Sequence, residues 1–326
     1  MIDVSASDNR SRTLVQALGV AVVFYLLAGT VEALLIKVVK PTEMELDWVS
    51  DAVLSMALGT AVYLWLHLRA TRLALTERQR AELVIQAQLS LAEAMQRRLL
   101  PSIPVAAGGF EWAATLTPAG KIGGDFYDFL ESGENARLML IADVSGKGIS
   151  AAMALSLVRS TFRNIARDTG SPARLAGRMS RAFQDEWHGS PYVTCVVARI
   201  DLHERTLTYT NAGHPAGLLV RKCGNRDLRE GGPPLGLLRD AHYVEERLAL
   251  RSGDVCVFVT DGITESLDGS RSLGAVAAAL VRDGSPSAAR ICDAIMARAL
   301  EGHGPDGVDD WADDRTVMVV ASRNLQ

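Results

Sequence analysis

Leu138-Met-Leu-Ile-Ala-Asp143-Val-Ser-Gly-Lys-Gly148 is the stretch that decides the fold. Five consecutive apolar residues run directly into an aspartate, and consecutive rather than alternating apolar positions predict a strand whose two faces are both covered. Four further runs rich in Val, Ile, Leu and Thr are also predicted strands: Val193 to Ile200, Thr206 to Thr210, Val255 to Thr260 and Thr316 to Ala321.

Helices are available to cover these strands. The segments with helical composition are Ile149 to Arg167, Pro172 to Trp187 and Pro286 to Leu300. Strands and helices of this kind predict an α/β sandwich with antiparallel hairpins. One expected hairpin is formed by Leu207 to Pro215 and turns on Gly213 and Pro215.

Acidic residues stand where the predicted strands begin or end. They are Asp143, Asp261 and the pair Asp313-Asp314, with Asp125 as a fourth site after the glycine pair Gly123-Gly124. Glycine lets another backbone approach closely. Carboxylates that converge at a sheet edge repel each other unless cations lie between them.

The chemistry of this acidic set favours a hard divalent cation. All of its side-chain donors are oxygen atoms, which suit Mg²⁺ or Mn²⁺ rather than zinc. Two such ions about 3.5 to 4 Å apart can bind a phosphate oxygen and activate water for in-line attack. A single aspartate at a strand end is usually a turn or cap residue, so the prediction depends on the four sites occurring together.

Five motifs follow one another along the chain: Gly123-Gly-Asp-Phe-Tyr-Asp, Asp143-Val-Ser-Gly-Lys-Gly, Asn211-Ala-Gly-His-Pro, Thr260-Asp-Gly and Asp313-Asp-Arg-Thr. In this order they resemble the motifs of PPM-type phosphatases, specifically those of the stage II sporulation protein E subfamily. The resemblance covers about residues 95 to 322 and includes the lead-in Gln96-Arg-Arg-Leu-Leu-Pro. It implies an α+β fold, an α/β/β/α sandwich of two mostly antiparallel sheets flanked by helices.

The same resemblance implies roles for the catalytic residues Asp125, Asp143, Asp261 and Asp313. Asp143 would bridge two Mn²⁺ or Mg²⁺ ions, the carbonyl of Val144 would bind the first, and Asp261 with Asp313 would complete the second. Asp125 would hold a water molecule of the metal site. Asp314 could replace Asp313 as the ligand, and we expect Asp313.

Other residues of these motifs are expected to play supporting parts. Asp128 is predicted to support its motif rather than bind metal, and His214, in a glycine-proline turn, is predicted to be structural. Arg315 and Lys121 depart from the family pattern, and we expect both to be solvated surface side chains rather than cations that bind a phosphopeptide. Lys147 belongs to no Walker motif, because Ile141 stands where that motif needs glycine.

The N-terminal part has the composition of a membrane anchor. Residues 14–36 and 48–68 are apolar stretches long enough for a hydrocarbon core of about 30 Å. Arginines precede the first stretch and follow the second, which places both ends in the cytoplasm by the positive-inside rule. A cleaved signal peptide and buried soluble helices are the alternatives for these stretches.

Residues 70–100 lack glycine and proline and predict a continuous helix that ends before Pro101. A three-four spacing of Val84, Ala87, Leu91 and Ala94 suggests homodimerisation through a coiled coil. A lone amphipathic stalk is the alternative.

Charge and cysteine content exclude other classes of protein. A formal net charge of −4 gives no reason to expect a nucleic-acid partner. The four cysteines form no C-x-x-C pair, and Cys195 and Cys256 lie in apolar runs as expected of core residues in a reducing compartment.

The sequence therefore predicts three segments: 1–69 as a membrane anchor, 70–104 as a helical linker and 105–326 as a phosphatase domain. The expected protein is a multi-pass protein of the cell membrane, with its catalytic domain in the cytoplasm. Its expected substrate, implied by the resemblance, is a phosphorylated regulatory protein of the anti-anti-sigma type. A catalytically inactive binding module of the same fold is the alternative, and a sensor kinase is disfavoured because no histidine occurs between His67 and His188.

Overall fold

The computed structural model describes Gly29 and residues 47–103, 106–120, 122–146, 149–188, 190–267, 270–282, 287–301 and 313–323. The chain divides into two compact units, residues 1–86 and residues 87–326. The second unit contains all the strands of the described residues.

Helix α2, Asp47–Leu99, is one continuous helix of 53 residues. It contains both the predicted second apolar stretch and most of the predicted linker helix, and it ends just before Pro101, which cannot donate a backbone hydrogen bond. Among the described residues, one helix is long and apolar enough to cross a membrane, and it lies within α2. The first predicted stretch, residues 14–36, lies outside the described residues apart from Gly29.

The second unit is built on two sheets. Sheet A has the order β1-β2-β12-β11-β7-β8, and its strands are Ala106–Ala107, Phe110–Thr117, Arg315–Ser322, Val255–Val259, Gly217–Arg221 and Gly224–Leu228. Sheet B has the order β10-β6-β5-β4-β3, and its strands are Glu246–Ala249, Thr206–Ala212, Val193–Asp201, Ala136–Val144 and Asp125–Glu131. The short strand β9, Gly231–Gly232, pairs in parallel with β6, and the other pairs are antiparallel.

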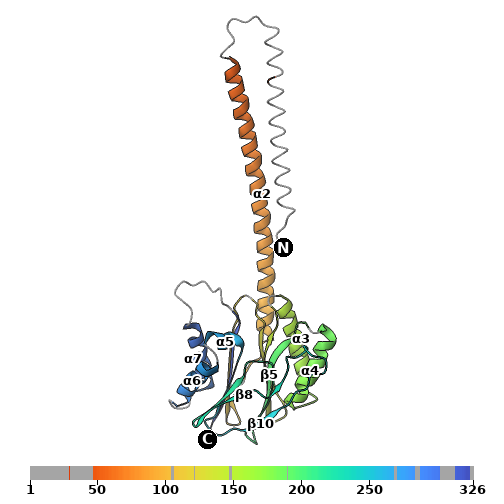
Figure 1. Cartoon of the computed structure of the whole chain (residues 1–326), viewed down its shortest axis with the longest axis vertical. Coiled ribbons are helices and arrows are strands. Elements are labelled where there is room, and N and C mark those ends of the chain that lie inside the picture. Colours follow the sequence, from red (N-terminus) through yellow and green to blue (C-terminus); the bar gives the residue numbers. More distant parts are fainter. Residues whose placement is uncertain are drawn as a thin grey trace. The chain divides into compact units, whose positions relative to one another are not determined.

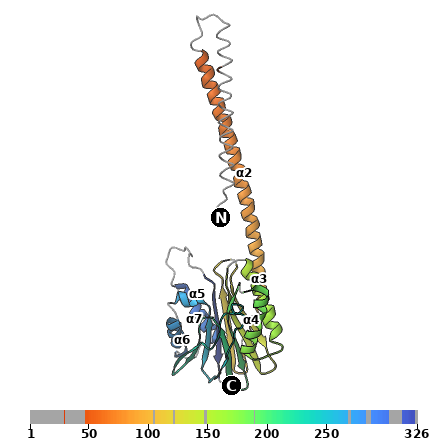
Figure 2. The same cartoon turned by 45° about the vertical axis from the view of Figure 1, so that its right-hand side comes forward.

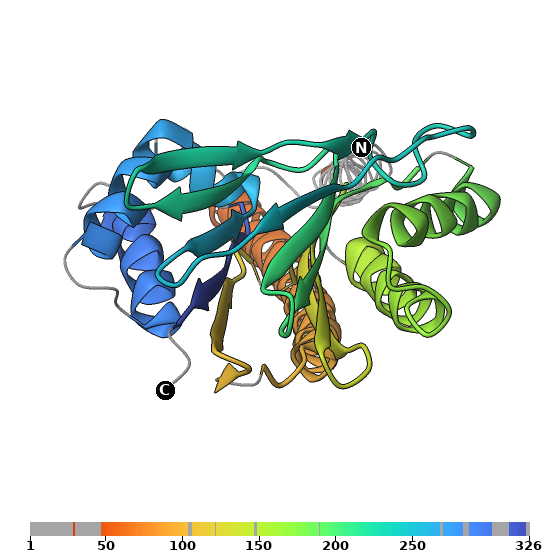
Figure 3. The ribbon, with the colours of Figure 1, turned by 90° about the horizontal axis from the view of Figure 1, so that it is seen from below.

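Helices cover the outer face of each sheet (Figure 1). Helices α3, Ile149–Ile165, and α4, Pro172–Trp187, pack on sheet B; the helices of sheet A are α5, Asp261–Ser266, α6, Ser270–Arg282, and α7, Ala288–Glu301. The turned view of Figure 2 and the view from below in Figure 3 show the strands between these two groups of helices. The fold class is therefore α+β with two sheets and flanking helices, as predicted.

Three layers of buried side chains follow from this arrangement. One lies between the sheets and includes Phe110, Tyr209 and Phe258. The other two lie between each sheet and its helices, for example around Leu140 and Phe162 under α3. Because sheet residues bury both faces, the strands have the consecutive apolar runs seen in the sequence.

The five predicted strands and three predicted helices are confirmed within a few residues at their ends. The predicted hairpin at Leu207 to Pro215 is wrong, because β6 belongs to sheet B and the next strand, β7, belongs to sheet A. Gly213, at φ 68°, turns the chain from one sheet to the other rather than back along β6. A side chain at Gly213 would also clash with the ring of Pro234.

The core cysteines are confirmed. Cys195 and Cys256 are buried and free, as is Cys292, whereas Cys223 is exposed and free.

Candidate functional site

Strands β3 and β4 bring the first two predicted site residues together. Asp125 opens β3 and lies directly opposite Asp143, which stands near the end of β4. Alternate residues of a strand face the same side, and Tyr127 and Ile141, two positions from these aspartates, pack between the sheets. Both carboxylates therefore project into one end of the layer between the two sheets.

Asp125 is buried and held by two threonines from the other sheet. The hydroxyl of Thr260 donates to its Oδ2 at 2.7 Å, and that of Thr316 donates to the same oxygen at 2.6 Å. Burial raises the pKa of Asp125 well above its ordinary value; the two hydroxyls act against this, and the charges of Asp143 and Asp314 add to it. Sequence reasoning assigned no role to these threonines, although both belong to the quoted motifs.

Gly124, the second glycine of the pair, lies close to the end of β4. A Cβ atom at Gly124 would lie 2.8 Å from the carbonyl oxygen of Val144 and 2.9 Å from Oδ1 of Asp143. The N–H of Val144 donates to the carbonyl of Gly124 at 3.0 Å. Glycine is therefore required here, because any side chain would fill the space beside two proposed metal-binding oxygens.

Gln96, near the end of α2, fixes the same loop. Its Nε2 donates to the carbonyl of Gly123 at 3.0 Å, and its Oε1 accepts from the N–H of Gly123 at 3.2 Å. Gln96 is buried. It lies in the lead-in motif quoted from the sequence, but the motif alone did not indicate this contact.

The remaining aspartates lie next to two strands of sheet A. Asp261 is the first residue of α5 directly after β11, and Asp313-Asp314 directly precedes β12, which pairs with β11. Thr260 is the N-cap residue of α5, but its hydroxyl serves Asp125 instead of the helix. Burial raises the pKa of Asp261, and the charge of Asp313 raises it further.

Asp313 and Asp314 have different surroundings. The carboxylate of Asp314 is buried and accepts three backbone N–H groups, from Ala119 at 2.8 Å, from Gly124, and from Asp125 at 3.4 Å. Oδ1 of Asp313 accepts the N–H of Asp314 at 3.1 Å. Asp314 thus organises the loop around Gly123 and Gly124, where a Cβ atom at Gly123 would overlap its carboxylate.

These elements enclose a cavity of about 260 Å³. Asp143, Asp313 and Asp314 line it, together with Gly124 and Gly146. Asp125 and Asp261 are outside the lining, although their pKa values respond to the charges of the residues that line it. The structure therefore gathers the acidic residues of four separate motifs at one end of the sandwich.

The oxygen atoms at this end fit a hydrated divalent cation. No three side chains of Asp, Glu, His or Cys within the described residues are placed to hold one metal ion. Mg²⁺ keeps several water ligands and is usually bound through only one or two carboxylates. Asp143, the carbonyl of Val144 beside Gly124, and Asp313 offer such a set. A cation there would offset the carboxylate repulsion that adds to the effect of burial in raising the pKa values of Asp125 and Asp261.

Asp128 and Arg315, which both belong to the quoted motifs, are buried. Asp128 is fully buried and accepts two hydrogen bonds of 2.7 Å from Arg163 of α3, so it joins β3 to its covering helix. The sequence predicted a supporting role for Asp128 but not this partner. The expected surface position of Arg315 is wrong: it is 9% exposed and its Nε donates to Ser266 of α5 at 3.2 Å. A strand flanked on both faces leaves little of its side chains in water, which explains this burial.

His214 is buried and shares a hydrogen bond of 2.9 Å between its Nδ1 and the hydroxyl of Thr194. Burial lowers its pKa to about 3. Its backbone N–H donates to Asn211 at 2.7 Å, which closes the turn between the sheets. These contacts agree with the predicted structural role. Lys121 and Lys147 lie outside the described residues.

Two relatives in sequence are phosphoserine phosphatases of Bacillus subtilis (strain 168). RsbU is 28% identical over 183 residues, which are 56% of this chain and 54% of that protein. RsbP is 24% identical over 192 residues, which are 57% of this chain and 47% of that protein. The chain thus spans about half the length of each relative.

Solved structures have the same fold. The SiaA-PP2C domain of Pseudomonas aeruginosa superposes with a TM-score of 0.63 at 20% identity, over 73% of this chain and 97% of that domain. The catalytic domain of the serine/threonine phosphatase PstP, described in complex with two manganese ions, has a TM-score of 0.50 at 14% identity, over 66% of this chain and 99% of that domain.

The family model of stage II sporulation protein E (SpoIIE) matches residues 133–323. This range is more than half of the chain. It contains Asp143, Asp261 and Asp313, which lie at the end of the sandwich that holds the acidic cavity. The chain belongs to the SpoIIE family.

Proposed function

We propose that this chain is a metal-dependent serine/threonine protein phosphatase. The observation that carries the proposal is the cavity lined by Asp143, from β4 of sheet B, and Asp313, from the segment that leads into β12 of sheet A, in a domain of the SpoIIE family. The names of RsbU and RsbP support phosphoserine as the substrate, and the manganese ions of PstP support divalent metals.

The residues of the cavity have distinct proposed roles. Asp143, the carbonyl of Val144, Asp261 and Asp313 would hold two Mn²⁺ or Mg²⁺ ions, and Asp125 would accept a hydrogen bond from water beside them. Asp314 would order the backbone rather than serve as the ligand, because three N–H groups already bind its carboxylate. When bound, such ions polarise a phosphoryl oxygen and lower the pKa of water.

Water is the proposed nucleophile. The residues that line the cavity, all of them described, offer no hydroxyl, thiol or imidazole group: they are Ala119, Gly120, Ile122, Gly124, Asp143, Gly146, Asp313 and Asp314. His214 is outside this lining and, with its lowered pKa, is uncharged near neutral pH. In the proposed reaction water attacks phosphorus directly, and the aspartates of the lining hold the metal ions or the backbone rather than act as nucleophiles.

The test is hydrolysis of a phosphoserine peptide by the full chain in lipid nanodiscs with Mn²⁺. Asp143→Asn and Asp313→Asn should each lower kcat by about 100-fold or more, and EDTA should abolish activity. The matched control is Asp185→Asn, an exposed aspartate of α4, which should behave as the unaltered chain. Equal turnover in EDTA would refute the metal mechanism, and a correctly folded, metal-loaded chain without turnover would establish the inactive binding module instead.

We propose a phosphorylated regulatory protein of the anti-anti-sigma type as the substrate. The SpoIIE family membership and the relation to RsbU support this class. Deletion of the gene should cause one such phosphoprotein to accumulate, which phosphoproteomics would identify. Accumulation of only unrelated phosphoproteins would contradict the proposed class.

We also propose that the N-terminal part anchors the domain to the membrane. Large apolar side chains of α2 are exposed, including Leu54, Met56 and Leu58. Farther along, Arg69 stacks over the ring of Trp65 at 5.2 Å, and such a pair suits the boundary between lipid and water. Together with residues 14–36 this would give two spans and a cytoplasmic domain; a C-terminal reporter active outside the cell would reverse the orientation.

Homodimerisation through residues 70–100 is the last part of the proposal. Val84 and Leu91, on the predicted seam, are exposed in the single chain. Cysteine crosslinking of Val84→Cys in a Cys223→Ser background should trap dimers, because the other cysteines are buried. A monomer at all concentrations in nanodiscs would favour the lone stalk.

A further inference from the structure

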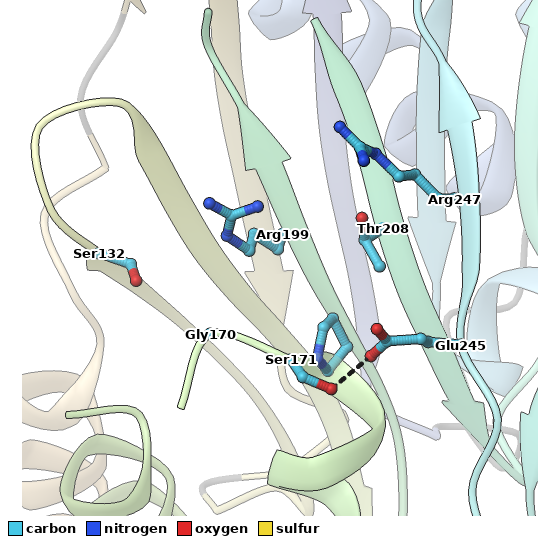
Figure 4. Close-up of a pocket in the computed structure, with 8 residues that line it drawn as sticks. Ser132, Gly170, Ser171, Arg199, Thr208, Glu245 and Arg247 are labelled. Carbon is cyan, nitrogen blue, oxygen red and sulfur yellow. Dashed lines mark hydrogen bonds between the residues drawn. The ribbon is translucent and has the colours of Figure 1, made fainter. Parts of the chain in front are cut away.

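A second polar cavity, of about 500 Å³, lies on sheet B away from the acidic site. Its floor is a row across three strands, in which Arg199 of β5 is paired with Thr208 of β6, and Thr208 with Arg247 of β10. Figure 4 shows these three side chains on neighbouring strands, with Ser132 and Ser171 at the rim. Paired residues lie about 5 Å apart, so the two arginines start about 10 Å apart on either side of a threonine hydroxyl.

The arginines keep donors available for a ligand. Arg199 donates from Nη2 to Asp201 at 3.2 Å, and Arg247 donates from Nε to Thr206 at 3.3 Å. A guanidinium carries five N–H donors, so these bonds use only part of each side chain. Both guanidinium groups are at the end of long, flexible side chains and can reach an anion above Thr208.

The one acidic residue of the lining is engaged elsewhere. Oε2 of Glu245 accepts the hydroxyl of Ser171 at 2.6 Å and the N–H of Ala173 at 3.0 Å, at the first turn of α4. A carboxylate is favoured at that end of a helix. The lining therefore has two cations and one anion, and that anion is paired with the helix. Asp201, outside the lining, forms an ion pair with Arg199 at 3.2 Å, which leaves the other N–H donors of Arg199 for a ligand.

The loop before α4 leaves room over the arginine. A Cβ atom at Gly170 would lie 3.5 Å from Nε of Arg199 and 3.9 Å from Oγ of Ser132. The absence of a side chain at Gly170 thus keeps the space between the guanidinium and the serine open. None of the eight lining residues, all within the described chain, is aromatic, so the cavity has no platform for a nucleobase.

From this arrangement we infer a binding site for a small phosphorylated molecule without a base, which two arginines and the hydroxyls of Thr208 and Ser132 would hold. The site is separate from catalysis. Arg199 lies five positions along β5 from Thr194, the partner of Asp143, which corresponds to about 16 Å. It also faces the helices, whereas Asp143 faces the opposite sheet.

The test measures binding of inorganic phosphate and pyrophosphate by calorimetry. The full chain in nanodiscs is kept in EDTA, so that no metal assists binding at the acidic site. Arg199→Gln with Arg247→Gln should weaken binding at least tenfold, whereas Asp143→Asn should leave it unchanged. The matched control replaces Arg290 and Arg298 of α7, which lie on the other sheet, by glutamine and should bind as the unaltered chain does.

A second variant keeps both arginines. Gly170→Val fills the space beside Arg199 and should also weaken binding, with an unchanged melting temperature as the check on folding. The site is refuted if binding survives both changes, if it is lost in Asp143→Asn, or if chloride at equal ionic strength competes as well as phosphate. Failure of phosphatase activity in the unaltered chain would leave this binding result intact, so the two proposals fail separately.

Discussion

Asp313 and Asp314 show how neighbouring residues of one type acquire different tasks. Sequence alone leaves them interchangeable, because both follow the same segment and precede the same strand. In the structure, Asp314 accepts three backbone N–H groups, whereas the side chain of Asp313 contacts the cavity and the N–H of its neighbour. The difference arises from loops distant in the sequence, which no local pattern could reveal.

Replacement of each aspartate by asparagine should therefore give opposite results. Asp314→Asn turns an amide N–H₂ toward backbone donors and should lower the free energy of unfolding by about 1–3 kcal/mol even in EDTA. Asp313→Asn should leave that free energy nearly unchanged in EDTA but weaken Mn²⁺ binding. Urea unfolding and metal titration measure the two effects, and the reverse pattern would make Asp314 the ligand.

The raised pKa of Asp125 predicts that the stability of the metal-free protein depends on pH. Because its folded pKa is raised, the folded state binds more protons than the unfolded state once pH exceeds the ordinary aspartate pKa. The free energy of unfolding should then fall as pH rises from that value toward the raised pKa, by at most about 1.4 kcal/mol per pH unit for one proton.

The variant Asp125→Asn should remove its share of this slope and be more stable than the unaltered chain near neutral pH. The two threonine hydroxyls can still donate to the amide oxygen. Denaturation in EDTA between pH 4 and pH 8 measures the slope. An identical slope in both proteins would show that Asp125 is not the responsible group.

The strands that bury both faces could be predicted from their composition. The way in which successive strands are connected between the two sheets could not. β4, β5 and β12 have uninterrupted apolar runs, so their positions follow from the sequence. Strand β8 has four exposed residues and gives no such signal. The turn at Gly213 looks like a hairpin locally, and only the pairing of β7 with β11 shows that it crosses between sheets.

The end of helix α2 supports the loop that contains Gly123 and Gly124 through Gln96. Gln96→Ala would leave the N–H of Gly123 without its acceptor, and a buried unpaired donor costs about 1–3 kcal/mol. We expect a lower melting temperature and weaker Mn²⁺ binding. Gln88→Ala, at an exposed glutamine of the same helix, is the control and should change neither; equal effects at both positions would mean that helix propensity, not the Gly123 contact, is responsible.

At the scale of the whole molecule, metal binding should stabilise the sandwich. The acidic residues come from strands of sheet B and from segments next to β11 and β12 of sheet A, so a cation among them favours only the folded state. Free Mn²⁺ at a hundredfold excess over its dissociation constant should add about 2.7 kcal/mol to the free energy of unfolding. Differential scanning calorimetry would show the rise in Tm, and Asp261→Asn should reduce it; an unchanged Tm in the unaltered chain would contradict a metal site.

The position of β12 inside sheet A also governs how the domain can be synthesised. β1 and β2 join the rest of their sheet only through β12, which is the last described strand to leave the ribosome. Until the segment from Asp313 to the end of β12 has been added, β2 cannot join β11 in sheet A and the acidic cluster is incomplete. A chain that ends before Asp313 should therefore have no phosphatase activity, because this one segment completes both the acidic cluster and the core.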